Sequence, residues 1–406
     1  MAFDVVIANA ALAGRDGRRD LGITGGVVRE IGTGLAGELQ VEADGGLVTH
    51  GLVDTHLHLD KSRILDCYPE LDGTLACAIR ETARLKADFT EDDVYDRAAA
   101  TLRDCVLGGT TTIRTHVEVD PIVGLRGFRA LQRLAKDHGH LVDVELCVFA
   151  QEGLMHSPVG QRLLEEALQL GAHTIGGAPY ADVDPTGQLD LVFGYAQRYG
   201  VPIDLHLDLA ESPDGMLLED VCRRTIAQGL QGSVAVGHVT QLSLVEPPRH
   251  AQLCALVADA GVAVTVLPAT DLYLMGRAAT HAKPRGVLDL SPLIELGVTC
   301  SVATNNVLNA FTPFGDASLI RMANLYSNVT HAGREDLERC LALVSTQAAR
   351  LIGHVTADHI EPGAPADLIC LPAESAADAV ARIVSPAWGM KAGRVTFTRA
   401  ATTLTA

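Results

Sequence analysis

The sequence of 406 residues lacks a long uninterrupted apolar run, a paired-cysteine motif and an excess of basic charge. No apolar run is long enough to span a bilayer, and hydrophobic residues make up 48% of the chain against 20% charged residues. This balance predicts a soluble globular protein that does not span a membrane. The first residues, MAFDVVI, lack the basic stretch and hydrophobic core of a secretion signal, which predicts a cytoplasmic location.

Cysteine usage and charge exclude two further classes of protein. The nine cysteines show no CxxC spacing, which indicates buried thiols in a reducing compartment rather than a disulfide framework. A formal net charge of −18, without a basic cluster interleaved with aromatic residues, argues against binding to nucleic acid. We therefore expect a small-molecule substrate as the partner, and association into a homo-oligomer stays open.

From residue 50 onward, short apolar strands alternate with longer helical segments eight times. This alternation is typical of parallel strands joined by right-handed crossovers. Eight units predict a closed (β/α)8 barrel of the TIM type over residues 51–356, and an open doubly wound sheet is the alternative. The predicted strands lie near residues 52–58, 111–118, 142–150, 173–179, 201–207, 233–239, 262–267 and 298–303.

Both ends of the chain read as short strands separated by turns. Residues 1–50 and 357–406 together predict a small β-sandwich domain built from both chain ends. Within the first segment, GTGLAG at residues 32–37 matches the dinucleotide fingerprint GxGxxG. That fingerprint requires a helix after the glycines, whereas the following residues 38–43 indicate another strand. We therefore interpret the match as a turn.

The stretch LVDTHLHLDKS at residues 52–62 is the most informative in the chain. Side chains alternate along a strand, so His56 and His58 project on the same face. Two imidazoles on a rigid strand provide half of a site for zinc, iron or a similar ion. A pair of exposed loop histidines is the alternative, and further ligands downstream would decide between the two.

The carboxyl ends of other predicted strands supply such ligands. In a barrel of this type these ends share one rim, where the chemistry takes place. The pair His116 and Glu118 also matches the start of the cytidine deaminase zinc motif, but the PCxxC that this motif requires is absent. The polar side chains at the predicted rim are His116, Glu118, Gln151, Asp204, His206, Asp208, His238, Asn305 and Asn306.

Taken together, these motifs resemble the amidohydrolase superfamily, and within it the cytosine deaminase group and the N-alkylammelide amidohydrolases. The resemblance rests on HLHLDK at residues 56–61, RTHVE at 114–118, FAQEG at 149–153, DLH at 204–206, GH at 237–238 and FTPFG at 311–315. It covers nearly the whole chain.

The resemblance implies one divalent metal, zinc or iron with manganese as a third choice, that activates water for hydrolysis. It assigns His56, His58 and His206 as ligands, with Asn305 in the fourth ligand position and also near the substrate. It assigns His238 to catalysis and substrate binding, and Gln151 to the amide edge of the substrate.

Two positions depart from the pattern that the resemblance implies. An aspartate is expected where Asn305 stands, and a proton-shuttling glutamate where Leu209 stands. An amide oxygen can ligate a metal, but it carries no charge and cannot accept a proton. The sequence offers two replacement bases. Asp208 shares the inward face with His206 and has a structural hydrogen-bonding role as its alternative, and His238 carries an imidazole, which can accept a proton near neutral pH.

The sequence thus predicts a metal-dependent hydrolase of the amidohydrolase type. It would cleave a C–N bond in a small nitrogen heterocycle or cyclic amide by deamination or a related hydrolysis. Because of Asn305 and Leu209, the alternative is a non-hydrolytic or metal-free member of the fold that binds a small molecule.

Overall fold

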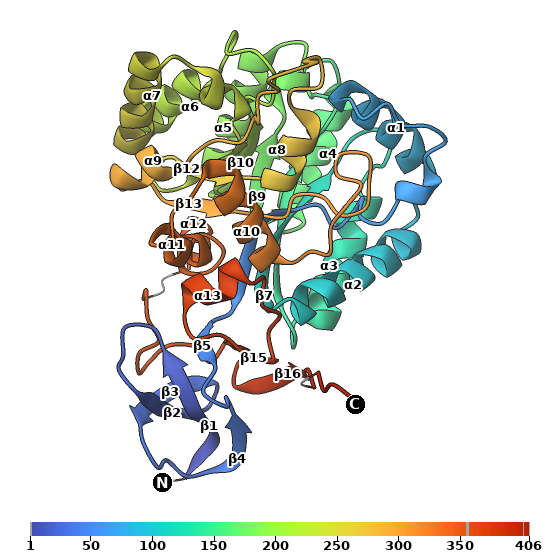
Figure 1. Ribbon diagram of the computed structural model, residues 1–406. Coiled ribbons are helices and arrows are strands. Elements are labelled where there is room, and N and C mark those ends of the chain that lie inside the picture. The colour runs from blue at the N-terminus through green and yellow to red at the C-terminus, as the bar shows by residue number, and fades with distance from the viewer. Residues whose placement is uncertain (1, 355–356, 401, 406) are drawn as a thin grey trace.

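The computed structural model describes residues 2–354, 357–400 and 402–405. A barrel of parallel strands surrounded by helices forms the larger part, and a mixed β-sheet lies beneath it (Figure 1). The two parts correspond to the architecture that the sequence predicts.

The barrel strands are almost entirely buried, because helices cover the outside and side chains fill the inside. They follow one another in sequence order, so each strand pairs in parallel with the next. The (β/α)8 prediction is therefore confirmed over the open doubly wound sheet. The strands are β6 (Leu52–Leu57), β7 (Thr110–Glu118), β8 (Asp143–Phe149), β9 (Thr174–Gly177), β10 (Ile203–Leu207), β11 (Val234–His238), β12 (Ala263–Val266) and β13 (Cys300–Val302).

The first and last barrel strands meet through Asn305. A bridge joins Leu57 to Asn305, the Asn305 N–H donates to the His56 carbonyl at 2.8 Å, and the His58 N–H donates to the Asn305 carbonyl at 2.8 Å. These contacts bring the end of β13 against β6. The barrel is thereby nearly closed, and its seam lies at the predicted histidine pair.

Local sequence signals set the helices that surround the barrel. In α2, Thr90 accepts a hydrogen bond from the Asp93 N–H at the N-terminus, and the buried residues Val94, Ala98, Leu102 and Cys105 recur at helical spacing. None of the helices in the described part of the chain combines the length and hydropathy that a membrane crossing requires. The helices are α1 (Leu75–Leu85), α2 (Glu91–Leu107), α3 (Arg126–His138), α4 (Pro158–Gln169), α5 (Pro185–Tyr199), α6 (Leu218–Gln228), α7 (Pro247–Ala260), α8 (Pro268–Leu274), α9 (Ser291–Glu295), α10 (Leu319–Thr330), α11 (Asp336–Ala342), α12 (Thr346–Leu351) and α13 (Ala376–Ala381).

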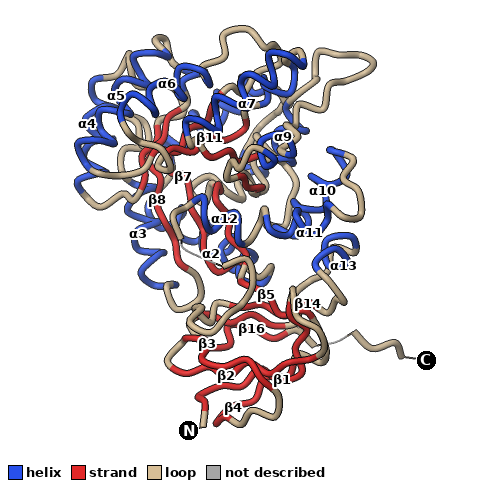
Figure 2. The backbone as a smooth tube through the Cα atoms, turned by 90° about the vertical axis from the view of Figure 1, so that its left-hand side faces the viewer, coloured by secondary structure: helices blue, strands red, loops and turns tan. Residues whose placement is uncertain are grey.

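Strands from both chain ends gather beneath the barrel (Figure 2). The sandwich expected from the sequence takes the form of one hydrogen-bonded mixed sheet, in the order β16-β15-β14-β5-β1-β2-β3, with β4 paired to β1. The segment after residues 32–37 is strand β4, so the GxGxxG match is a turn that leads into a strand. The sheet strands are β1 (Phe3–Leu12), β2 (Arg18–Thr24), β3 (Val27–Gly32), β4 (Gly37–Glu42), β5 (Leu47–His50), β14 (Leu368–Leu371), β15 (Trp388–Lys391) and β16 (Arg394–Thr398).

Candidate functional site

Three of the predicted metal ligands converge at the carboxyl end of the barrel. His56 and His58 come from β6 and its end, and His206 comes from β10. The Nε2 atom of His206 lies 3.0 Å from Nε2 of His56 and 3.0 Å from Nε2 of His58. All three rings are buried, with at most 2% of their surface exposed. The structure therefore brings together residues that lie 150 positions apart in the chain.

The protonation of these rings suits a metal. Burial is the main cause that holds the pKa of all three imidazoles well below its usual value, and repulsion by neighbouring cationic groups adds to it. Neutral rings keep a lone pair for a ligand. In His58 the Nδ1 atom lies 3.2 Å from the His116 carbonyl, so Nδ1 carries the proton and Nε2 carries the lone pair.

The polar atoms of the cluster are not satisfied within the protein. One proton on Nε2 of His206 could serve only one of its two Nε2 neighbours, and Nδ1 of His56 and of His206 has no hydrogen-bond partner in the described residues. Two imidazoles on one metal ion, each with a bond of about 2.0–2.1 Å, place their nitrogens roughly 3.0–3.4 Å apart. The two observed separations lie at the short end of that range, and His56, His206 and His238 place ligand nitrogens within 4.8 Å of one another. The histidines present therefore fit a bound metal ion.

Asn305, the fourth predicted ligand, stands at the barrel seam. Its backbone hydrogen-bonds to His56 and to His58, the two predicted ligands from β6 and its end, and its φ of 63° lies in the left-handed region. Its Oδ1 atom is buried and lacks a hydrogen-bond partner in the part of the chain that the structure describes. A buried amide oxygen without a partner is costly, and a metal ion would satisfy it.

His238 lies beside the three ligands and has a carboxylate partner. Its Nδ1 atom is 2.6 Å from Oδ1 of Asp271 in α8, and the second oxygen of Asp271 accepts the Leu267 N–H at 3.1 Å. With Nδ1–H directed to Asp271, the Nε2 atom of His238 keeps its lone pair. The sequence predicted His238 but missed Asp271, since this aspartate follows a different strand and no fixed spacing links the two.

Strand β11 can lie close to the His56 ring because residue 237, which precedes His238, is a glycine. A Cβ atom at Gly237 would lie 3.0 Å from Nδ1 of His56, which is tighter than side chains normally pack. His238 itself has a φ of 72°. Such strained backbone at a strand end is typical of residues that are held in place for a function.

His116 and Asp204 form a second layer beneath the ligands. The His116 ring stacks on that of His56 with centroids 3.7 Å apart, and its Nε2 lies 3.5 Å from Oδ1 of Asp204. Arg114 pairs with the other oxygen of Asp204 at 3.2 Å. Because Arg114 neutralises Asp204, this layer supports the ligand histidines rather than offering a second metal site of its own.

A cluster of buried charges, the lysine–carboxylate cluster, borders the histidines. Nζ of Lys61 lies 2.6 Å from Oε1 of Glu118, and Nζ of Lys86 lies 2.7 Å from its Oε2. Lys86 also pairs with Asp120 at 2.7 Å and Glu152 at 2.6 Å. Burial opposes ionisation of Glu118, but the two lysines outweigh it and lower the pKa of that carboxyl to about 2. No sequence pattern predicted Lys86, which reaches the cluster from the segment between α1 and α2.

Gln151 links this cluster to the wall of the site. Its Oε1 lies 3.4 Å from Nζ of Lys61, and its Nε2 donates to the hydroxyl of Tyr180 at 3.2 Å. Lys61 also lies over the ring of Phe311, 4.4 Å from its centroid. Gln151 is therefore held at the predicted rim by partners on two sides.

Asp208 and Leu209 follow His206 in the chain, but their contacts are not those of an acid–base pair. Both oxygens of Asp208 accept backbone N–H groups at the start of α6, from Leu217 at 2.8 Å and Leu218 at 3.1 Å. This is the structural role that the sequence left open, and a catalytic role for Asp208 stays a prediction. Leu209 is buried in an apolar cluster with Leu274 and Phe311.

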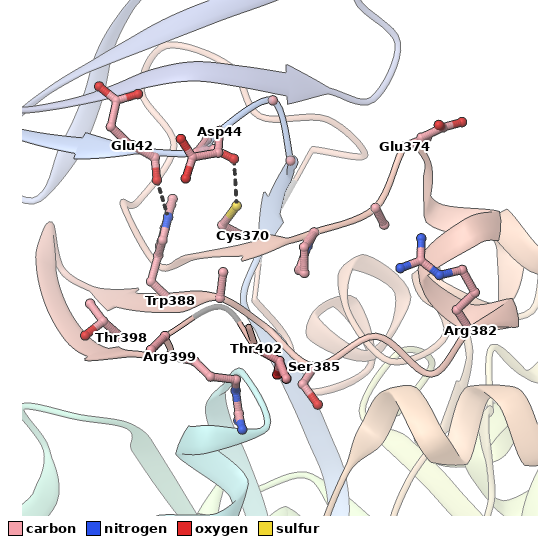
Figure 3. Close-up of a pocket in the computed structure, with 17 residues that line it drawn as sticks. Glu42, Asp44, Cys370, Glu374, Arg382, Ser385, Trp388, Thr398, Arg399 and Thr402 are labelled. Carbon is pink, nitrogen blue, oxygen red and sulfur yellow. Dashed lines mark hydrogen bonds between the residues drawn. The ribbon is translucent and has the colours of Figure 1, made fainter. Parts of the chain in front are cut away.

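A separate cavity of about 690 Å³ lies in the β-sheet region, away from the histidines (Figure 3). Trp388 in its wall donates from Nε1 to the Glu42 carbonyl at 3.0 Å, and Arg399 donates to the carbonyls of Pro386 and Leu107. None of the predicted site residues is among the described residues that line it. The predicted chemistry thus belongs to the barrel.

Comparison with known proteins agrees with this geometry. The chain is 26% identical over 380 residues to N-isopropylammelide isopropyl amidohydrolase of Pseudomonas sp. (strain ADP), which covers 91% of each chain. The structure of 5-methylcytosine deaminase from Klebsiella pneumoniae with 5-fluorocytosine superposes with a TM-score of 0.93, 26% identity and 99% coverage of both chains. That of N-isopropylammelide isopropylaminohydrolase from Burkholderia multivorans gives a TM-score of 0.83, 28% identity and coverage of 96% and 97%.

The family assignment follows from a separate match. Residues 70–397, more than three quarters of the chain, match the family described as "Amidohydrolase family". The barrel, the converging histidines and the related structures all agree with it. The chain therefore belongs to the amidohydrolase family.

Proposed function

We propose that this protein is a metal-dependent hydrolase that cleaves a C–N bond in a small nitrogen heterocycle or cyclic amide. The observation that carries the proposal is the meeting of three buried imidazoles whose lowered pKa keeps them neutral. Deamination and removal of an alkylamine are the reactions of the related proteins and the first to consider.

His56, His58 and His206 would hold the metal, with Asn305 as a neutral fourth ligand. Zinc and iron suit this nitrogen-rich set best, and manganese is a third choice. The bound ion would supply a nucleophile by lowering the pKa of a coordinated water to about 7.

Proton movement falls to His238 in this proposal. Leu209 cannot accept a proton, and both oxygens of Asp208 are occupied by backbone N–H groups. His238 keeps Nδ1–H on Asp271, so its Nε2 can take a proton and return it to the leaving nitrogen. Asp271 acts through His238 by fixing its tautomer and stabilising the protonated ring.

Gln151 and Lys61 would hold the substrate. The amide of Gln151 is directed by Lys61 and Tyr180, and Nζ of Lys61 donates to Glu118. Such a pair suits a carbonyl next to the scissile C–N bond, because an amide and an ammonium both offer N–H donors.

The second candidate is a metal-free protein of the same fold that binds a small molecule. It is favoured by one observation, which is that the two positions expected to carry carboxylates read Asn305 and Leu209. Fewer negative charges weaken the hold on a cation.

Elemental analysis of protein purified without chelator separates the two candidates. We expect about one equivalent of transition metal in the natural protein, its loss in His206→Ala, and its retention in His281→Ala, which removes an exposed histidine. Loaded protein is then screened for ammonia or alkylamine release from aminated pyrimidines, triazines and cyclic amides. Absence of metal after loading with zinc, iron or manganese would overturn the hydrolytic proposal in favour of the binding protein.

A further inference from the structure

A cavity of about 640 Å³ opens at the mouth of the barrel. Its walls come from the segments that follow β6, β9, β10 and β12, which are four strands spread around the barrel. Segments that follow such distant strands can meet only near the barrel axis, where the histidines also point. The lining residues lie at 74–76, 79, 180–181, 209–211, 274–275 and 277–278.

The walls of this cavity are apolar. Ile79 of α1, Leu274 of α8 and Met275 pack with Leu209 in one hydrophobic cluster. The polar side chains lie at the rim, where the Arg277 N–H donates to Glu211 at 2.9 Å and the Arg277 guanidinium stacks over Tyr273 at 4.3 Å. Ligand cavities of a few hundred Å³ with apolar walls and few polar groups are typical of sites for small organic molecules.

Two residues connect the cavity to the histidine site. Leu209 follows His206 by three positions and contributes to the cavity wall. Tyr180 lines the same cavity, and its hydroxyl accepts the hydrogen bond from Gln151. Leu209 and Tyr180 therefore lie between the cavity and the proposed substrate site.

We propose that this cavity is a subsite for an apolar alkyl or aryl substituent carried by the substrate ring. The inference rests on the proposed function, because it extends the same site towards solvent. A leucine at position 209, where a carboxylate was expected, removes the charge that would disfavour such a group there. A charged substituent would lose its hydration against Ile79, Leu274 and Met275 without gaining a partner.

The test compares the affinities of benzylated and unsubstituted rings. Cytosine, N4-benzylcytosine and 5-benzylcytosine are titrated into metal-loaded protein by calorimetry. We expect one benzylated ring to bind about tenfold or more tighter than cytosine, as burial of an aromatic group predicts.

A matched pair of substitutions assigns the preference to the cavity. Ala76→Phe fills it from α1, whereas Ala83→Phe adds the same ring on the same helix outside the lining residues. The preference should fall to about twofold or less in Ala76→Phe and persist in Ala83→Phe. Leu209→Asn, which makes the floor polar with little change in size, should also reduce it. Melting temperatures and metal content confirm that each variant is folded.

The subsite is overturned if the benzylated rings bind no tighter than cytosine, do not bind, or keep their advantage in Ala76→Phe. Release of the hydrolysis product, which is uracil from cytosine and N4-benzylcytosine and 5-benzyluracil from 5-benzylcytosine, is followed separately. A benzyl preference without hydrolysis supports the subsite and counts against the proposed function. Hydrolysis of cytosine without a benzyl preference supports the proposed function and overturns the subsite.

Discussion

Two buried polar clusters stand side by side at the barrel rim, and they are built on opposite principles. The histidine centre leaves Nδ1 of His206 and Oδ1 of Asn305 without hydrogen-bond partners in the described structure. The lysine–carboxylate cluster, in contrast, pairs each lysine with Glu118 at 2.6–2.7 Å. Both share strand β7 and the end of β6, so burial does not distinguish them. The clusters differ in whether their buried polar atoms have partners. Buried atoms without a hydrogen-bond partner indicate a place for a ligand, whereas paired charges indicate a structural role.

The acidic group Glu118, Asp120 and Glu152 illustrates the point. By composition and proximity it could hold a cation, and it does hold one, the ammonium of Lys86. A metal would have to displace this lysine. The comparison therefore favours the histidine centre over this acidic group as the place for a metal ion.

Removal of Lys86 should produce the largest effect on stability. Lys86→Met leaves Asp120 and Glu152 without their cation and Glu118 with Lys61 alone, which should lower the free energy of unfolding by about 3–5 kcal/mol. Denaturant titration measures the loss, with Lys136→Met on the exposed end of α3 as the control. Metal content per folded molecule should not change. A variant that kept its stability but lost its metal would break the distinction between the clusters.

Asp271→Asn tests the partner of His238 within the histidine centre. An amide in place of the carboxylate no longer stabilises the protonated imidazole, so turnover should fall about 10–100-fold while the metal is retained. Steady-state kinetics on the identified substrate measures this effect, and Asp259→Asn on the exposed face of α7 provides the control. Unchanged kcat would show that protons take another route.

Asn305→Asp adds the charge that the histidine centre lacks. A carboxylate beside a bound cation should tighten metal binding by about tenfold or more. Competition with a chelator measures the affinity, and Asn328→Asp on α10 adds the same charge far from the site. If the affinity stayed the same or fell, Asn305 would not be a ligand, and the seam of the barrel would have only a structural role.

Asp208→Asn should have the smallest effect. Replacing one of its two acceptor oxygens with an amide nitrogen disrupts one hydrogen bond at the start of α6, which should cost about 1 kcal/mol of stability. Turnover should stay within about twofold. A loss of 100-fold or more in kcat would instead establish Asp208 as the base that the sequence predicted.

The sequence predicts those parts of the molecule that depend on local pattern. All eight barrel strands follow from apolar runs, and helix α2 occupies residues 91–107 as its periodicity predicts. The histidines were found because each stands at or near the end of such a strand. The sequence pattern also predicts one helix over residues 335–352, but the structure divides this stretch into α11 (Asp336–Ala342) and α12 (Thr346–Leu351).

Residues that reach the site from connecting segments were missed. Lys86 and Asp271 enter from the regions after β6 and β12, and no spacing in the chain relates them to Glu118 or His238. Their contacts depend on how far each segment folds back over the rim. The apolar cavity at the mouth of the barrel was missed for the same reason, because Leu209 and Ile79 become neighbours only in the folded barrel.

The hydrogen bonds of Asn305 to His56 and His58 have a consequence for biosynthesis. During translation the two histidines emerge about 250 residues before the strand that locks them in place. Until the segment that follows β13 docks against β6, the two backbone hydrogen bonds between Asn305 and the histidine pair cannot form. The predicted ligand set is therefore brought together in the same event that closes the barrel, and a chain that ended before residue 305 would lack Asn305 and its two contacts to the histidines.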